Sequence, residues 1–278
     1  MIMSPLKIFS GLIMFLALLL AMNMTAYSQT KDSKVPLSSK EAIESHKYIE
    51  LDVKNLMHVY WALRDIEIDN TTIDQYLMLT ECKIYQDYYN NDIKWHKIRK
   101  ATRSYLNSIR DNFPRTLYFV IPVDFKRYDV EAQKFALTKS SIFENAYEIS
   151  ITAKPPLQSK YCEDLEFEEL NKTYPHQVVL SLNSPFSLSY IEMPPDKAQR
   201  LISKVFSQNK NERRTVFLKF YVTLNDFRGF GQDKDSKYSF IDTNLDKIEL
   251  YESPELTSKV VDVDRTPNRA GAIRESFK

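Results

Sequence analysis

Pro114 separates two kinds of hydrophobic pattern in this chain. From residue 52 to residue 113, apolar side chains recur at the three- and four-residue spacing of helices, whereas beyond Pro114 they alternate or run together as in strands. A chain that groups its helices before its strands lacks the regular alternation that builds parallel βαβ units. The sequence therefore predicts an α+β fold, in which a helical segment at 52–113 packs on an antiparallel sheet formed within 115–262.

Three helices are expected before Pro114. Asp52 suits the N-cap of the first helix, because its short side chain can accept a hydrogen bond from the backbone of the first turn. Asn70-Thr71-Thr72 would break that helix and cap the second, and Asn90-Asn91-Asp92 would do the same before the third. The third helix is expected to stop at Pro114, which cannot continue it.

The pattern after Pro114 is divided by turn-forming residues, such as Asn183-Ser184-Pro185. The clearest alternation predicts a strand that a loop at 229–237 turns into a hairpin. Pro194-Pro195 opens a further short helix near 195–208, because proline is favourable in a first turn. The expected strands are 117–121 together with 123–128 as one strand, then 134–137, 144–153, 178–182, 187–191, 215–227 and 238–251.

The first 28 residues have the composition of an export signal. Lys7 precedes an apolar run from Ile8 to Leu20, and the small residues Ala26 and Ser28 suit cleavage after Ser28. We therefore expect residues 1–28 to be a signal peptide and the mature protein to reach the periplasm or the extracellular space. An uncleaved membrane anchor is the alternative, because the uncharged stretch is long enough to span a bilayer.

The mature chain is expected to consist of a flexible lead-in at 29–47, a single α+β domain at 48–262 and a flexible tail at 263–278. Cleavage removes Lys7 and no acidic residue, which leaves equal numbers of acidic and basic residues. A neutral chain gains little from counterion release, so a nucleic-acid partner is not expected. We also expect no membrane contact after cleavage.

Glycine is scarce, with only four in the whole chain, against a usual share of about 7%. Phosphate-binding loops and nucleophile elbows need glycines at fixed offsets, because the backbone must approach a ligand closely or adopt positive φ. No such cluster is present. The sequence therefore argues against P-loop enzymes, dinucleotide-binding folds, kinases and hydrolases with a glycine-flanked serine.

Cys82 and Cys162 are the only cysteines, and export would place them in an oxidising compartment. They are a candidate disulfide, which would close a loop of about 80 residues. An inert buried thiol and a nucleophilic cysteine are the alternatives. The histidines show no pair at metal-ligand spacing, so neither a metal nor another cofactor is expected. The four histidines are His46, His58, His96 and His176.

Two groups of residues are candidate ligand surfaces. Arg228 and Phe230 flank glycines in the predicted hairpin loop, where charge and ring stacking could recognise a ligand. Tyr85, Tyr88, Tyr89 and Trp95 lie close together in sequence and would suit a sugar- or peptide-binding platform, although core packing is the alternative. The third helix also has a basic face for a polyanion or anionic lipid, unless it is simply solvated, made of His96, Lys100, Arg103 and Arg110.

Several short motifs resemble a family of bacterial exported proteins classed as a domain of unknown function. The resemblance extends over about residues 48–261 and implies a bacterial cell-envelope setting, with no activity, cofactor or ligand. The motifs are Asp74-Gln75-Tyr76-Leu77, Glu81-Cys82-Lys83-Ile84-Tyr85, Asn91-Asp92-Ile93-Lys94-Trp95 with Ile98-Arg99, and Tyr128-Asp129 with Phe135 and Leu137.

The leading functional hypothesis is a non-enzymatic exported domain that binds a protein or another envelope component. One alternative is a secreted hydrolase of cell-wall or host material, with a carboxylate pair such as Asp124 and Asp129 or Glu163 and Glu166. A second alternative is an envelope component tethered through its uncleaved N-terminal segment.

Overall fold

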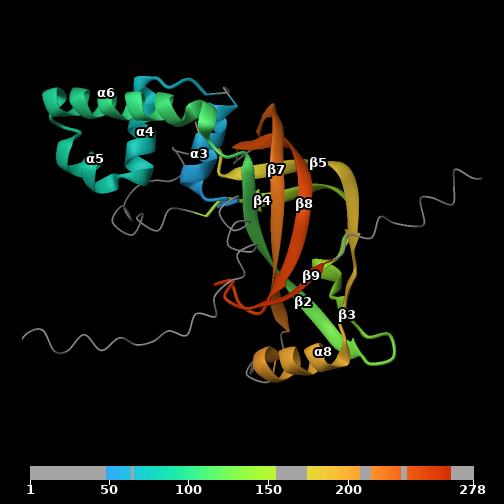
Figure 1. Ribbon diagram of the computed structural model, residues 1–278. Coiled ribbons are helices and arrows are strands. Elements are labelled where there is room, and N and C mark those ends of the chain that lie inside the picture. The colour runs from blue at the N-terminus through green and yellow to red at the C-terminus, as the bar shows by residue number, and fades with distance from the viewer. Residues whose placement is uncertain (1–47, 64–65, 155–173, 207–213, 233–236, 264–278) are drawn as a thin grey trace, which may run out of the picture. The chain divides into compact units, whose positions relative to one another are not determined.

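The computed structural model describes residues 48–263 apart from 64–65, 155–173, 207–213 and 233–236 (Figure 1). All of these residues belong to one compact unit, residues 43–278. Within the described ranges, five α-helices accompany a nine-stranded sheet, which confirms the α+β class. The predicted signal peptide, the lead-in and the tail after Val263 lie outside the described residues.

The helices before Pro114 begin close to their predicted caps. The Asp52 and Asn91 side chains each accept a hydrogen bond from the first turn of the following helix. The second cap is Asp69, one residue earlier than expected, and it forms a capping box with Thr72. The four helices of this segment are α3 (Val53–Ala62), α4 (Asn70–Thr80), α5 (Cys82–Tyr88) and α6 (Asp92–Ile109).

The segment therefore has four helices where three were expected, because the second one divides at Glu81. The Thr80 hydroxyl donates to the carbonyl of Tyr76 (2.9 Å), and Glu81 takes the non-helical φ of −135° and ψ of 46°. The last helix runs into a 3-10 turn, η1 (Arg110–Asn112), and ends before Pro114 as predicted.

The strands follow the order β4-β5-β8-β7-β2-β3-β6, with β1 beside β2 and β9 beside β8. The sheet is mixed rather than wholly antiparallel, because the pairs β1–β2 and β5–β8 are parallel. Both parallel pairs are separated in sequence by whole elements, which gives the chain enough length to cross over. The strands are β1 (Ile49–Glu50), β2 (Thr116–Asp129), β3 (Lys134–Leu137), β4 (Phe143–Thr152), β5 (Gln177–Leu188), β6 (Tyr190–Glu192), β7 (Thr215–Gln232), β8 (Lys237–Tyr251) and β9 (Lys259–Val263).

Several strands are longer than predicted. β2 is the single strand expected across the exposed Pro122, whereas β5 continues through Asn183–Pro185 near an irregular stretch of its pairing with β4. Proline is tolerated where regular ladder bonding is already interrupted. β7 likewise continues to Gln232, with Gly229 at a φ of 143° beside a register shift. The strands β1 and β9 have no counterpart among the predicted ones.

The sheet curls back on itself, because its last strand, β6, follows β5 after the single residue Ser189. The carbonyl of Ser189 accepts the backbone N–H of Leu137 (2.9 Å), which extends the pairing between β6 and β3. The concave side is filled by phenylalanine rings around the fully buried Phe220. The rings of Phe119 (5.2 Å between centroids) and Phe143 (5.7 Å) pack against it.

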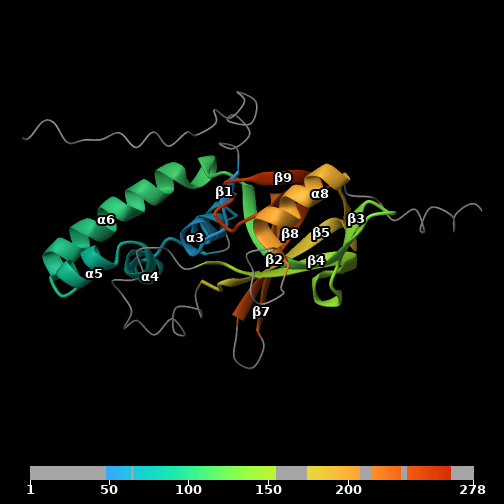
Figure 2. The same cartoon turned by 90° about the horizontal axis from the view of Figure 1, so that it is seen from below.

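Helices close the two ends of the curled sheet. Figures 1 and 2 show α3 to α6 at one end and α8 (Pro195–Leu201) at the other. At the first end, the buried Tyr60 of α3 donates its hydroxyl to the carbonyl of Pro175 (2.8 Å) and also meets Ser239 of β8. At the second end, the π-helical turn η4 (Ile202–Phe206) places Phe206 against Phe135. The core is therefore continuous from the helices to the sheet.

Candidate functional site

Helices α4 and α6 are joined by one carboxylate, which we name the Asp74 clamp and define as Asp74, Trp95 and Arg99. Asp74 accepts hydrogen bonds from the Trp95 indole N–H (3.0 Å) and from Arg99 Nε (2.6 Å), and it also pairs with Arg99 Nη2. The hydrogen bond that Arg99 donates to Asp74 raises the pKa of Arg99. A two-pronged arginine–carboxylate pair fixes distance and orientation together, so the clamp sets how α6 lies on α4.

Three of the four aromatic residues predicted as a ligand platform come together beside this clamp. The Tyr85 and Tyr89 rings stack at 4.4 Å between centroids, and both meet the Trp95 ring edge-on at about 5.5 Å. Burial, with the Tyr89 hydroxyl as a further cause, raises the pKa of Tyr85 to about 12. Trp95 is only 3% exposed, so it supports the two tyrosines from below and does not itself face solvent.

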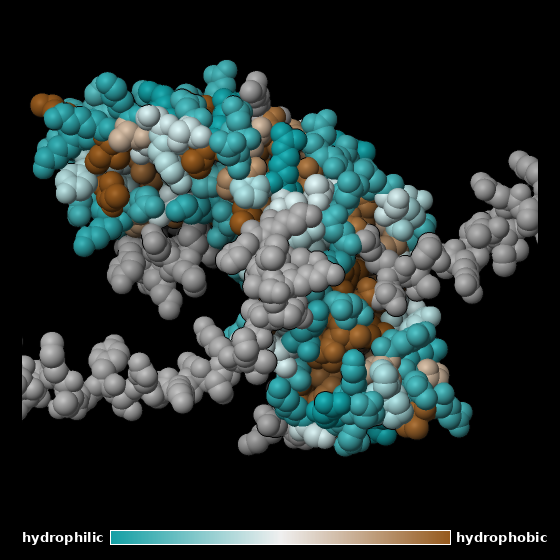
Figure 3. Space-filling view, in the orientation of Figure 1, coloured by the Kyte–Doolittle hydropathy of each residue, from teal (hydrophilic) through white to brown (hydrophobic). Residues whose placement is uncertain are grey.

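Four large side chains at the α5–α6 junction, near this aromatic cluster, are exposed. They are Ile84, Tyr88, Tyr89 and Ile93, which we name the α5–α6 surface. Ile93 is 73% exposed and the other three are 37 to 41% exposed. Figure 3 shows separate brown side chains among teal ones at this end of the helical segment. The Lys94 ammonium lies 5.2 Å from the centre of the Tyr88 ring and adds positive charge at its edge.

The predicted basic face of α6 divides into two parts. Arg103 donates to the Ile68 carbonyl and the Asn70 side chain, and Arg110 donates to the Trp61 carbonyl (2.9 Å). These two arginines tie α6 to the neighbouring helices. His96 and Lys100 are exposed, so the solvated part of the face is smaller than the sequence pattern indicates.

The other predicted ligand residues, Arg228 and Phe230, belong to the β7–β8 hairpin. Arg228 Nε pairs with Asp242 across the hairpin (2.7 Å). The Phe230 ring packs on Phe227 (4.9 Å) and on Tyr60 of α3 (5.8 Å). These contacts anchor the hairpin to α3 and lie apart from the Tyr85, Tyr89 and Trp95 rings, so the structure does not merge the two candidate surfaces.

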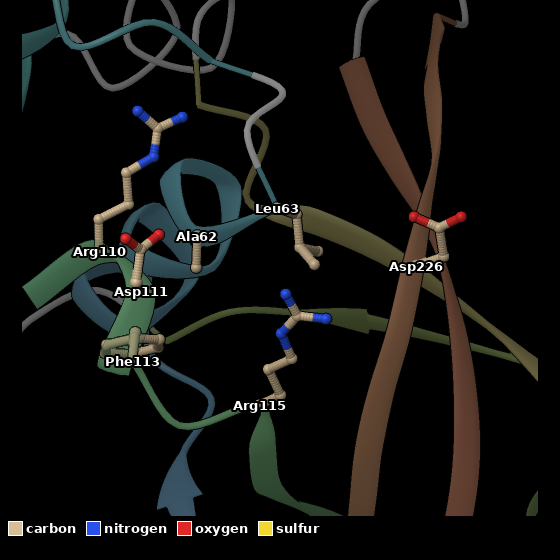
Figure 4. Close-up of a pocket in the computed structure, with 7 residues that line it drawn as sticks. All are labelled: Ala62, Leu63, Arg110, Asp111, Phe113, Arg115 and Asp226. Carbon is tan, nitrogen blue, oxygen red and sulfur yellow. The ribbon is translucent and has the colours of Figure 1, made fainter.

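A cavity of about 310 Å³ lies where α3, η1, the start of β2 and β7 meet. Figure 4 shows arginine and aspartate side chains around an apolar part of the wall. Arg115, just before β2, and Asp226, on β7, face this space from two elements. Its lining residues are Ala62, Leu63, Arg110, Asp111, Phe113, Arg115 and Asp226.

Part of the chain matches a known protein family. Residues 69–204 match the family model described as Domain of unknown function (DUF4852). Over these residues the chain is similar to that family. This confirms the resemblance to a family of unknown function that the sequence motifs indicate. No curated protein and no solved structure matches the chain.

The DUF4852 match begins at Asp69, the N-cap of α4, and ends within η4. The Asp74 clamp, the aromatic cluster and the α5–α6 surface all lie inside it. Strands β7, β8 and β9 lie outside it, and with them Arg228 and Phe230. The helical surface is therefore part of the matched DUF4852 region, whereas the hairpin residues are not.

One charged cluster, on β7, β8 and β9 beyond the DUF4852 match, is absent from the sequence-based predictions. Glu249 of β8 is only 4% exposed and accepts hydrogen bonds from the hydroxyls of Tyr221 and Tyr251. The Lys247 and Lys259 ammonium groups lie 3.2 and 3.4 Å from its other oxygen. Burial alone would raise the pKa of Glu249, but these hydrogen bonds and the Lys247 charge lower it overall. The cluster holds the strands together.

The histidines of the chain do not form a shared site in the described residues. His58 of α3 is buried, with Nε2 3.2 Å from the Tyr76 hydroxyl and Phe113 edge-on at 4.9 Å. Burial lowers the pKa of His58 to about 4 and also lowers that of His176. No group of three or more histidine, cysteine or acidic side chains in the described ranges has the arrangement of a metal site. His46 lies outside those ranges.

The candidate hydrolase carboxylates are placed separately. Asp124 accepts the hydroxyl of Thr215 (2.6 Å), and Asp129 caps the turn between β2 and β3. Neither lines the cavity of Figure 4. Glu163 and Glu166 lie outside the described residues, so the structure gives no geometry for that pair.

The candidate disulfide has one partner within the described residues. Cys82 is the first residue of α5 and is 3% exposed, whereas Cys162 lies outside the described ranges. The disulfide therefore stays a prediction. No helix of the described part of the chain has the length and apolar character to cross a membrane.

Proposed function

We propose that this protein is an exported binding domain that docks a protein partner through the α5–α6 surface. The observation that carries the proposal is the exposure of Ile93, Tyr88, Tyr89 and Ile84 within ten residues of the chain, across the junction of α5 and α6. Adjacent exposed apolar side chains are uncommon on a surface that only meets water, and they mark interaction sites. Tyrosine is also among the residues that contribute most to binding energy at interfaces.

The support beneath this surface favours recognition by a fixed shape. Trp95 fills the space below Tyr85 and Tyr89, and the Asp74–Arg99 pair holds α6 against α4. Side chains that are already ordered lose less conformational entropy on binding, so more of the contact energy appears as affinity. If the Asp74 clamp served only to stabilise the fold, the tyrosine rings beside it would not need to reach the solvent.

Export is part of the same proposal, on the grounds of the apolar run from Ile8 to Leu20 and the small residues before the expected cleavage after Ser28. It places the protein in the periplasm or outside the cell, where a bond between Cys82 and Cys162 would form. Intact-mass measurement on protein recovered from the producing cells tests both points. The measured mass is expected to be that of a chain beginning at Gln29. The mass before reduction should be lower than the mass after reduction by two hydrogen atoms. An intact Met1 would contradict cleavage.

Site-specific photocrosslinking in the producing cells tests the docking surface. A photoreactive residue at Ile93 is expected to give a discrete crosslinked product, because that side chain would lie within the interface. Val130, in the β2–β3 turn, is the matched control, since it is 70% exposed and apolar but distant in the fold. The Tyr89→Ser change should remove the Ile93 product. Equal products from Ile93 and Val130, or none from Ile93, would refute the docking surface.

A further inference from the structure

The cavity between α3 and the sheet has unpaired charge of both signs on its wall. In the described part of the chain, the Arg115 guanidinium makes no ion pair or side-chain hydrogen bond. The Asp226 carboxylate accepts only the backbone N–H of the next residue, Phe227 (2.9 Å). Arg115 and Asp226 are therefore available to groups of opposite charge that enter the cavity.

Strand pairing places the backbones of these two residues near each other. The Leu224 N–H donates to the carbonyl of Arg115 (2.8 Å), so the start of β2 lies directly against β7. Asp226 is only two residues further along β7. The hydrogen bond from Phe227 fixes the direction of the Asp226 carboxylate. The points from which the two side chains extend are thus set by strand pairing and not by a flexible loop.

The rest of the wall supplies an apolar contact area. Ala62 and Leu63 end α3, and Phe113 precedes β2. Phe113 is held by its edge-on contact with the buried His58 ring. Arg110 also lines the cavity, but its Nε is engaged by the Trp61 carbonyl (2.9 Å). In Figure 4 the Arg115 side chain extends toward Leu63, and Asp226 faces the same space from β7.

We infer that this cavity binds a small apolar zwitterion, an amino acid or dipeptide with an aliphatic side chain. Its carboxylate would pair with Arg115, its ammonium group with Asp226, and its side chain would contact Leu63 and Phe113. Charge-assisted hydrogen bonds to both charged groups of one ligand favour a zwitterion over a molecule that carries only one of the two charges. The volume of about 310 Å³ is at the lower end of the usual range for ligand sites, which limits the ligand to this size.

The test compares leucine with two analogues that each lack one charge. Leucinamide keeps the ammonium group without the carboxylate, and 4-methylpentanoate keeps the carboxylate without the ammonium group. Binding is followed by the amide NMR signals of Leu224 and Phe227 in the purified protein. Leucine, or the dipeptide alanyl-leucine, is expected to bind at least about tenfold more tightly than either analogue. If leucine binds more tightly than alanyl-leucine, the ligand class is a free amino acid. If alanyl-leucine binds more tightly, the ligand class is a dipeptide.

Single substitutions assign each charge to its partner. Arg115→Gln should make leucine and leucinamide bind equally, because the carboxylate then has no cation to meet. Asp226→Asn should make leucine and 4-methylpentanoate bind equally. The controls are Arg127→Gln and Asp87→Asn, two exposed residues away from the cavity, which should leave the preference for leucine unchanged.

Three results would overturn the inference: no signal change with leucine or the dipeptide, equal binding of leucine and both analogues, or identical behaviour of the Arg115 and Arg127 variants. The inference is independent of the proposed docking surface. Tyr89→Ser, which tests that surface, is expected to leave leucine binding unchanged.

Discussion

At the scale of single residues, His58 shows what burial does to a titratable side chain. Its imidazole lies among Trp61, Tyr76 and Phe113, and its Nε2 has the Tyr76 hydroxyl as a partner. Charging this ring would require water that the packed helices exclude, which is why burial lowers its pKa to about 4. The folded protein therefore keeps His58 neutral where an exposed histidine would begin to charge.

This shift predicts a loss of stability in mild acid. The unfolded chain has a His58 pKa of about 6.5. Between pH 6.5 and pH 4, His58 is therefore protonated in the unfolded state and neutral in the folded state. Stability present above pH 6.5 should fall by about 3 kcal/mol as the pH approaches 4. Urea unfolding at several pH values measures this.

The variant that isolates the effect is His58→Gln, which keeps a hydrogen-bonding side chain without a titration. Its unfolding free energy should depend less on pH than that of the wild type. The exposed His96→Gln variant is the control and should follow the wild type. A His58→Gln protein with the full wild-type pH dependence would show that other groups cause the loss.

Glu249 is the second residue whose surroundings predict a measurable effect. Glu249→Gln removes the charge that Lys247 and Lys259 surround, while the Tyr221 and Tyr251 hydroxyls keep an oxygen to donate to. Loss of one partner of a buried ion pair is strongly destabilising, but the two lysine side chains are about one-third exposed and can be rehydrated. We expect a cost of about 2 kcal/mol at pH 7 by urea unfolding.

The control for Glu249 is Asp262→Asn, which removes a neighbouring carboxylate. Asp262 lies 3.3 Å from the same Lys259 ammonium, but its side chain is 69% exposed. An exposed pair of this kind contributes less than about 1 kcal/mol. Similar costs for the two variants would mean that burial of Glu249 adds nothing to the pair.

At the scale of secondary-structure elements, the Asp74 clamp determines how α6 lies on α4. Asp74→Asn keeps the shape of the side chain but removes the charge that Arg99 pairs with. The expected cost is about 1 to 2 kcal/mol, the range for a charge-assisted pair that is partly shielded from water. Hydrogen exchange should also quicken in α6 more than in β7. The exposed Asp87→Asn variant should change neither, and an unchanged exchange rate in α6 would disprove the clamp.

Local chemistry explains which elements the sequence predicts well. Asp52 and Asn91 cap their helices through side-chain bonds to residues three positions away, so the sequence alone contains both partners. The Tyr85 and Tyr89 stack is likewise a contact between neighbours one helical turn apart. These features were predictable because each depends on residues close together in the chain.

Distant partners explain what the sequence does not predict. Asp74 meets Trp95 across two helices, and Glu249 meets Tyr221 across two strands, so neither contact has a periodic signature. The parallel pair β5–β8 is also set by the curl of the sheet and not by any local pattern. The cavity between Arg115 and Asp226 has the same origin, because only strand pairing brings the two residues together.

At the scale of the whole molecule, the helices and the curled sheet share one core, so a covalent link within it should affect the whole of unfolding. A bond from Cys82 to Cys162 would close a loop of about 80 residues in the unfolded chain. The loss of chain entropy on closing such a loop is worth about 4 kcal/mol, before any strain. Reduction of the protein should lower its unfolding free energy by about that amount.

Separate cysteine variants distinguish a disulfide from a buried thiol. If the two residues are bonded, Cys162→Ala should cost as much as reduction does, and reduction should then have no further effect on that variant. If Cys82 is only a core thiol, Cys82→Ala should be destabilising through the cavity it leaves, because Cys82 is 3% exposed, while Cys162→Ala should cost little. The decisive measurement is urea unfolding of Cys162→Ala with and without reductant. A stability equal to that of the oxidised wild type would exclude the bond and with it the argument that links this fold to an oxidising compartment.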